Sequence, residues 1–131
     1  MVTTPPADTT ANAAAVSVIL FCNVAQANPL GAIALDVLPS ARTSESEMVP
    51  TTTNDLVVHV IANALIIRGT LDNGETPRSV ANDGAHPVEG GDASLWISTK
   101  PGELLNTTVS SSGWASQVSN GVAIVVRGFQ D

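Results

Sequence analysis

Few side chains in this sequence could do acid–base or nucleophilic chemistry, and they are far apart. The chain has two histidines, His59 and His86. His59 lies in the apolar run LVVHVIA, which predicts a strand residue with one satisfied ring nitrogen rather than a general base. His86 precedes a proline in a glycine-rich stretch and is expected to face solvent.

Catalytic and cofactor-binding motifs are absent from the sequence. It has no Gly-x-Ser-x-Gly elbow, phosphate-binding glycine loop, paired-histidine motif or dinucleotide fingerprint. A serine nucleophile would need a histidine and a carboxylate converging on it, and no spacing indicates that arrangement. We therefore expect no catalytic residue, and a protein that is not an enzyme.

Signals for a metal site are also weak. Cys22 is the single cysteine, so it can form neither an intrachain disulfide nor a thiolate metal site, and we expect it to be a small buried hydrophobe. Residues 72–92 contain carboxylates that could hold calcium, and the candidates are Asp72, Asp83 and Asp92. Their spacing does not match the known calcium loop, and turn-forming residues explain them better. The sequence therefore predicts no metal and no cofactor.

The charge balance narrows the classes of partner. The 12 acidic and 5 basic residues give a net charge of −7, and the basic residues are scattered along the chain. Such a surface repels phosphate, so we expect neither nucleic acid nor an anionic membrane as a partner. The longest apolar runs are too short to span a bilayer, and the N-terminal residues lack the basic region of a secretion signal. A soluble chain synthesised in the cytoplasm is the expectation.

The pattern of β-branched runs and turn residues is typical of an all-β protein. Residues 39–53 are predicted to form a loop or extended connection, and residues 72–92 the longest loop. Residues 121–128 are apolar on both faces, which indicates a strand at the centre of its sheet. The predicted strands cover residues 16–24, 33–38, 55–62, 64–70, 93–99, 103–110 and 114–129.

Seven or so short strands without a convincing helix favour an antiparallel β-sandwich. Residues 1–15 are rich in threonine and proline without apolar periodicity, so they are predicted to form an extended N-terminal arm. Residues 16–131 are predicted to form a single β-sandwich domain.

The two tryptophans are given different roles. Trp114 precedes the aliphatic run near the end of the chain and is expected to plug the core at one end of the sandwich. Trp96 alternates with Leu95 and Ile97, so it lies on the opposite face of its strand from these two residues. One of these faces meets the core, and Trp96 is the candidate for contact with a partner.

The order of these segments also resembles a known family. A strand VSVILFCNV, a turn NPLGA, then VPTTTNDLVVHVIA, GGDASLWISTK and SGWASQVSNGVAIVVRG together resemble jelly-roll-like β-sandwich domains of phage virion proteins and bacterial surface proteins. The resemblance covers roughly residues 16–128 and implies a jelly-roll-like fold. The family often carries an aromatic residue in the long loop, whereas residues 72–92 have none.

The resemblance implies a virion structural protein, and we expect a capsid decoration or cement protein. Its partners would be the major capsid protein and neighbouring copies of itself, as a homo-oligomer on the capsid surface of a phage. The alternative is a carbohydrate- or receptor-binding module of a tail fibre or bacterial surface protein, which the lack of tyrosine disfavours. The candidate interface residues are Thr3, Thr4, Pro5, Pro6, Thr9 and Trp96.

Overall fold

The computed structural model describes residues 16–38, 40–63, 69–71, 74–83 and 93–128 of the chain. Within these residues the protein contains strands and connections but no helix, so no helix there is long and apolar enough to cross a membrane. The strands are β1 (Leu30–Val37), β2 (Arg42–Thr51), β3 (Leu56–Asn63), β4 (Thr70–Leu71), β5 (Thr76–Asp83), β6 (Ala93–Pro101), β7 (Leu105–Gln117) and β8 (Ser119–Val126).

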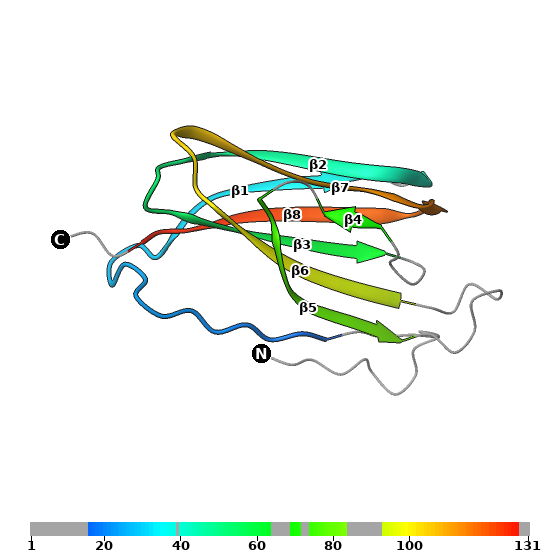
Figure 1. The fold of residues 1–131 in the computed structure, drawn as a ribbon, viewed down its shortest axis with the longest axis horizontal. Helices are drawn as coiled ribbons and strands as arrows, with labels where there is room; N and C mark the ends of the chain where they lie inside the picture. Colours follow the sequence, from blue (N-terminus) through cyan, green and yellow to red (C-terminus); the bar gives the residue numbers. More distant parts are fainter. Residues whose placement is uncertain (1–15, 39, 64–68, 72–73, 84–92, 129–131) are drawn as a thin grey trace.

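The strands form two antiparallel sheets packed face to face (Figure 1). The larger sheet has the order β1-β8-β3-β6-β5, and the smaller one has the order β2-β7-β4. This confirms the predicted antiparallel β-sandwich. A jelly roll pairs its first strand with its eighth, its second with its seventh and its third with its sixth, as this chain does. The chain departs from that pattern at β5, which pairs with β6 at the edge of the larger sheet.

The space between the sheets is divided into an apolar and a polar part. Five small apolar residues pack together in the apolar part, and they are Val49, Val57, Val109, Ala123 and Val125. The polar part begins one alternation further along the same strands, where His59 on β3 and Glu45 and Glu47 on β2 point inward. Because strand side chains alternate between faces, one strand contributes to both parts of the interior.

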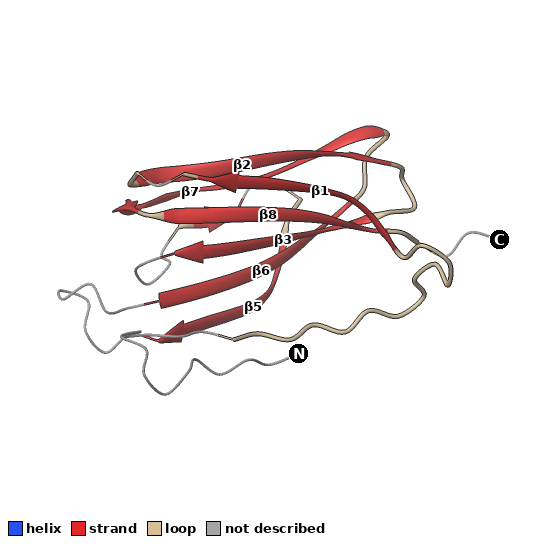
Figure 2. Ribbon diagram, turned by 180° about the vertical axis from the view of Figure 1, so that it is seen from behind, coloured by secondary structure: helices blue, strands red, loops and turns tan. Residues whose placement is uncertain are grey.

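The outer face of the larger sheet is also apolar. The segment before β1, which Figure 2 draws as a loop, contributes Ile19, Phe21 and Val24 to this face. These three residues pack against a second buried group formed by Val58, Ile97 and Val126. The cover stops short of β1, whose outward side chains Ile33, Leu35 and Val37 are 58%, 67% and 61% exposed. An apolar cavity of about 430 Å³ lies between the covering segment and the sheet.

One strand prediction and the prediction for Cys22 fail at the N-terminal end of the domain. Residues 16–24 do not form a strand, apart from an isolated bridge between Val24 and Gly128. They cover the sheet through alternate apolar side chains, and this contact produces the same β-branched pattern as a strand. Cys22 is exposed rather than buried, because the segment that contains it lies on the surface of the domain and not inside a sheet.

Two of the predicted loops contain strands. Residues 39–53 include β2, and residues 72–92 include β5. Both strands are rich in polar residues, which the sequence pattern assigned to loops. Near its start, β2 carries polar residues on both faces, because its inward positions there are glutamates.

The boundary between the last two strands also differs from the prediction. Trp114 lies inside β7, which continues to Gln117, and the last strand begins only at Ser119. Trp114 is buried, and its Nε1 donates a hydrogen bond to the carbonyl oxygen of Arg42 at 2.9 Å. The predicted arm, residues 1–15, lies outside the described residues.

The alternation of buried and exposed side chains along β2 predicts a large loss of stability for one substitution and a small one for its neighbour. Val49→Ala removes two methyl groups from a fully buried site and should lower the free energy of unfolding by about 2 kcal/mol. Met48→Ala, at an exposed position, should change it by less than about 0.5 kcal/mol. Urea denaturation of both variants measures the difference. Equal losses would contradict the assignment of residues 42–51 to a strand.

Candidate functional site: a buried histidine–glutamate cluster

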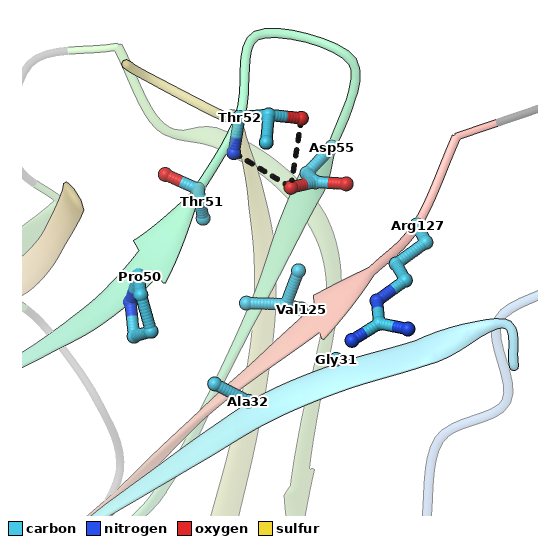
Figure 3. Close-up of a pocket in the computed structure, with 8 residues that line it drawn as sticks. All are labelled: Gly31, Ala32, Pro50, Thr51, Thr52, Asp55, Val125 and Arg127. Carbon is cyan, nitrogen blue, oxygen red and sulfur yellow. Dashed lines mark hydrogen bonds between the residues drawn. The ribbon is translucent and has the colours of Figure 1, made fainter. Parts of the chain in front are cut away.

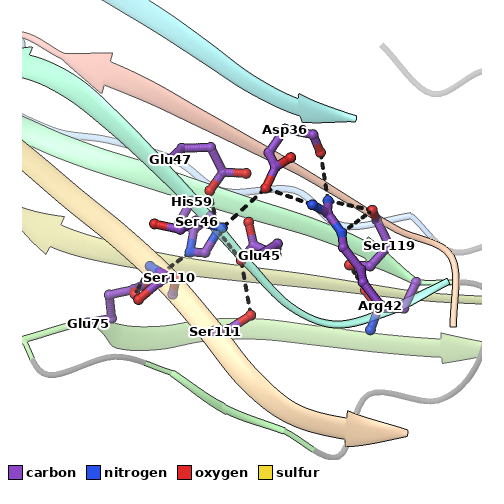
Figure 4. A network of polar contacts seen from close by, with 12 residues as sticks. Asp36, Arg42, Glu45, Ser46, Glu47, His59, Glu75, Ser110, Ser111 and Ser119 are labelled. Atoms are coloured by element: carbon purple, nitrogen blue, oxygen red, sulfur yellow. Dashed lines mark hydrogen bonds and ion pairs between the residues drawn. The ribbon is translucent and has the colours of Figure 1, made fainter. Parts of the chain in front are cut away.

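One histidine and three glutamates meet between the two sheets (Figure 4). We call His59, Glu45, Glu47 and Glu75 the His59 cluster. The Nε2 atom of His59 lies 2.8 Å from Oε1 of Glu45 and 3.1 Å from Oε2 of Glu47. Its Nδ1 atom lies 2.7 Å from Oε1 of Glu75. All four side chains are 0–1% exposed.

The sheets bring these residues together from distant parts of the sequence. Glu45 and Glu47 are two residues apart on β2, so both project from its inner face. His59 projects from the facing strand β3, and Glu75 lies in the residues just before β5. Gly121 of β8 leaves the room that the carboxylates need, because a Cβ atom there would overlap an oxygen of Glu47 and an oxygen of Glu45.

Three serines satisfy part of the cluster. Ser98 donates from its hydroxyl to Oε1 of Glu75 at 2.7 Å, and the backbone N–H of Ser110 donates to Oε2 of Glu75 at 2.9 Å. Ser111 donates from its hydroxyl to Oε1 of Glu45 at 3.0 Å. Glu75 therefore has partners on both oxygens and is the best-anchored carboxylate.

Glu47 is the least satisfied member. Neither of its carboxylate oxygens has a hydrogen-bond partner among the described residues, and the same holds for Oε2 of Glu45 and Nε2 of His59. The Nε2 atom is close to two carboxylates, yet it meets neither in hydrogen-bond geometry. Burying polar atoms without partners is costly, so this corner of the cluster needs a compensating charge or proton.

The electrostatics of the cluster follow from burial and from the carboxylates around the ring. Burial lowers the pKa of His59, but the adjacent Glu45, Glu47 and Glu75 raise it to about 11. For Glu47, burial raises the pKa, and neighbouring Glu45 adds to this against the effect of His59, so that it reaches about 7. Burial also raises the pKa of Glu45, yet contacts with His59 and Ser111 bring it below its usual value.

A second ion pair lies next to the cluster in Figure 4. Arg42 contacts Asp36 at 2.8 Å and also donates to the carbonyl oxygen of Ser119. Burial raises the pKa of Asp36, but the hydrogen bonds from Arg42 and from the Ser46 N–H hold it below its usual value. This pair connects the start of β2 to the end of β1 and the beginning of β8.

Burial limits the chemistry that the His59 cluster can perform. Its side chains are buried, so no substrate can reach them without separation of the sheets. A group of one imidazole and two carboxylates can instead hold a metal ion, and the ligand atoms of Glu45, Glu47 and His59 all lie within 4.8 Å of one another.

A small open pocket lies at the other end of the sandwich (Figure 3). Its volume is about 300 Å³, and Thr52, Asp55 and Arg127 provide its polar lining together with Thr51. The carboxylate of Asp55 accepts hydrogen bonds from the backbone N–H and the hydroxyl of Thr52, and these bonds close the turn between β2 and β3. The pocket places no histidine, cysteine or second carboxylate next to Asp55, so its polar groups act in the turn.

The structure places few of the sequence-predicted site residues in a site. Trp96 is half-buried and faces the same side of its sheet as His59, with Leu95 and Ile97 on the other side as predicted. Asp83 is the last residue of β5. The remaining predicted residues lie outside the described part of the chain, and they are Thr3, Thr4, Pro5, Pro6, Thr9, Asp72, His86 and Asp92.

Sequence reasoning missed Glu45 and Glu47, and it considered Glu75 only among the carboxylates of residues 72–92 that could hold calcium. His59 is a strand residue with one hydrogen-bonded ring nitrogen, as predicted, but the carboxylates close to both nitrogens were not foreseen. The available signal was the strict alternation of SESEMV in residues 44–49. In a strand, Glu45 and Glu47 lie on the same face as the apolar Val49. Glu75 gave no such signal, since it lies in a connection.

Comparisons of the chain with protein-family models, with curated proteins and with solved structures found no significant match.

The cluster makes stability depend on pH in the metal-free protein. The pKa of Glu47 rises from 4.5 to about 7 on folding, so stability falls as the pH rises through this window. The pKa of His59 rises from 6.5 to about 11, so its contribution is complete below 6.5 and is lost as the pH rises toward 11. In chelator, the free energy of unfolding should therefore decline from about pH 5 to about pH 10.

Glu47→Gln is the matched variant for this pH series. Glutamine resembles a protonated glutamate in shape, so the variant should lose the decline between 4.5 and about 7 and keep the decline at higher pH. Denaturant unfolding at a series of pH values gives the result. A wild-type stability that rises steadily from about pH 6 to about pH 9 would contradict the described contacts.

The space above Gly121 gives a separate prediction. Gly121→Ala should lower the free energy of unfolding by about 1–3 kcal/mol, because its methyl group displaces two buried carboxylates. Asn120→Ala, one residue away on the opposite face of β8, is the control and should cost less than about 1 kcal/mol. A neutral Gly121→Ala substitution in thermal or urea unfolding would show that the carboxylates do not pack against this strand.

Proposed function

We propose that this chain is a non-enzymatic structural protein of a phage virion, a capsid decoration protein that binds and stabilises the shell. The observation that carries the proposal is the apolar outer face of the larger sheet. The resemblance of the sequence to virion β-sandwich domains suggests the partner of this surface, which is the major capsid protein.

The apolar outer face consists of cross-strand rows of aliphatic residues. Leu35 of β1 pairs with Val122 of β8, which pairs in turn with Val60 of β3. The next row begins with Ile33 and continues to Ile124 and Val58. An antiparallel sheet that faces water on one side normally carries polar residues there. An apolar face that is left open at β1 therefore supports a role in binding another protein.

The interior supports a non-enzymatic role. The His59 cluster is the one group of described residues that joins a histidine to carboxylates, and it is closed to solvent. The alternative function, a carbohydrate-binding module, needs exposed aromatic rings. Trp114 is buried and holds a hydrogen bond inside the protein, so only Trp96 of the two tryptophans keeps partial exposure.

The shell surface is the proposed occupant of the apolar outer face. Free copies of the protein carry a charge of −7 each, which opposes their association with one another in solution. A shell offers many identical positions, so modest contacts at each one add up to a large effect on the stability of the particle. Neighbouring copies would then meet only after they have docked.

A pair of charge substitutions tests the proposed interface. Leu35→Asp introduces a charge in the apolar outer face and should lower the amount bound to shells at least about tenfold, since burying an unpaired charge is costly. Met48→Asp, on the outward side of β2 in the smaller sheet, is the control and should bind normally. Thermal melting of both proteins verifies that they are folded.

Quantitative mass spectrometry of purified particles measures the bound amount. The wild-type protein should be present in roughly hundreds of copies per particle, as repeated decoration requires. A copy number of a few to a few dozen would favour a tail fibre instead. Equal binding of the two aspartate variants would reject the apolar outer face as the interface.

A further inference from the structure

The unsatisfied corner of the His59 cluster has the composition of a metal site. It joins one imidazole nitrogen and two carboxylates from two facing strands, with all ligand atoms within 4.8 Å of one another. Ligands at 2.0–2.1 Å around a tetrahedral zinc ion are separated by roughly 3.3 Å. The observed separations of 2.8 Å and 3.1 Å from Nε2 of His59 to the carboxylates need to widen only slightly to admit the ion.

A second observation points to the same position. Both oxygens of Glu47, Oε2 of Glu45 and Nε2 of His59 are buried without hydrogen-bond partners among the described residues. Each of these atoms is a good metal ligand, and together they converge on one small volume. A cation there would satisfy all three side chains at once.

The opposite side of the ring is arranged as in known zinc sites. Glu75 accepts a hydrogen bond from Nδ1 of His59, which leaves Nε2 free to act as a metal ligand beside Glu45 and Glu47. Metal-ligating histidines are commonly oriented by a carboxylate in this way. Glu75 is itself fixed by Ser98 and Ser110, so the ring has little freedom to turn.

We propose that Glu45, Glu47 and His59 bind a divalent transition-metal ion, with zinc as the best fit, and that the ion joins β2 to β3. A neutral His59 with a doubly charged cation and three carboxylates leaves a net charge of −1, whereas a protonated His59 alone leaves −2. The imidazole ligand favours zinc over calcium or magnesium, which prefer oxygen ligands. Because the site is closed, the ion is structural and enters as the protein folds.

The proposal departs from the expectation of no metal and is independent of the virion role. It also differs from the calcium candidates Asp72, Asp83 and Asp92, which belong to another part of the sequence. These three residues therefore provide a matched control. Their replacement by asparagine should leave zinc binding unchanged.

The experiment is refolding of the full chain in zinc or in chelator, followed by metal analysis and thermal melting. Wild-type protein refolded in zinc should retain roughly one ion per chain and melt about 5 °C or more above the chelator-treated protein. Glu47→Gln should lose both the ion and the zinc-dependent shift. The triple variant Asp72→Asn/Asp83→Asn/Asp92→Asn and the surface variant Glu103→Gln should keep both.

Cobalt refolding keeps the test decisive if Glu47→Gln fails to fold. Wild-type protein with cobalt should show the visible absorption of cobalt bound by Glu45, Glu47 and the imidazole of His59. Identical melting in zinc and chelator, with no retained metal, would overturn the proposal. So would retention of the ion by a folded Glu47→Gln variant, since the metal would then lie elsewhere.

Discussion

The burial of three glutamates around a single histidine is the constraint on which the rest of this structure depends. Carboxylates cannot be taken out of water cheaply, and the protein meets this cost with one imidazole, two serine hydroxyls and a backbone N–H. Gly121 on β8, the strand beside β3, leaves the space that the carboxylates of Glu45 and Glu47 occupy. Part of the space between the sheets is therefore occupied by charged side chains and the groups that compensate them.

The apolar part of the interior supplies hydrophobic stability through a cluster of small side chains, with Ile61 and Trp114 also buried in the protein. Valine and alanine form the group between the sheets, and the larger aliphatic residues are used on the outer face of the larger sheet. That face is covered by residues 19–24 at its centre and stays open at β1. The sandwich thus combines a polar cluster in its interior with an apolar outer face on the larger sheet. The apolar outer face supports the proposed docking role.

Sequence patterns predicted the fold class because most strands here carry an ordinary signal. The runs around Val58, Ile97 and Ile124 are β-branched and bounded by turn residues, and all three became strands of the larger sheet. β2 was missed because its inward positions near Arg42 are charged, so alternation of burial produced no alternation of hydropathy. The prediction of a strand at residues 16–24 failed for the opposite reason. A segment that packs on the face of a sheet needs the same apolar residues as a strand inside the sheet.

The candidate site could not be predicted, because its members become neighbours only through the pairing of distant strands. His59 looked like an ordinary core residue, and Glu75 looked like part of a polar loop. Nothing in the local sequence tells whether a glutamate at an inward position faces solvent at a sheet edge or a histidine across the interior. That information lies in the order of the strands.

The protonation state of His59 tests the account most directly. In metal-free protein carrying His86→Gln, His59 is the only histidine, and isotopic labelling allows nitrogen NMR of its two ring nitrogens. Carboxylates at both nitrogens, with a pKa of about 11, predict that each nitrogen still carries a proton at about pH 8. A neutral ring at that pH, titrating near the ordinary value of 6.5, would show that the glutamates do not surround it.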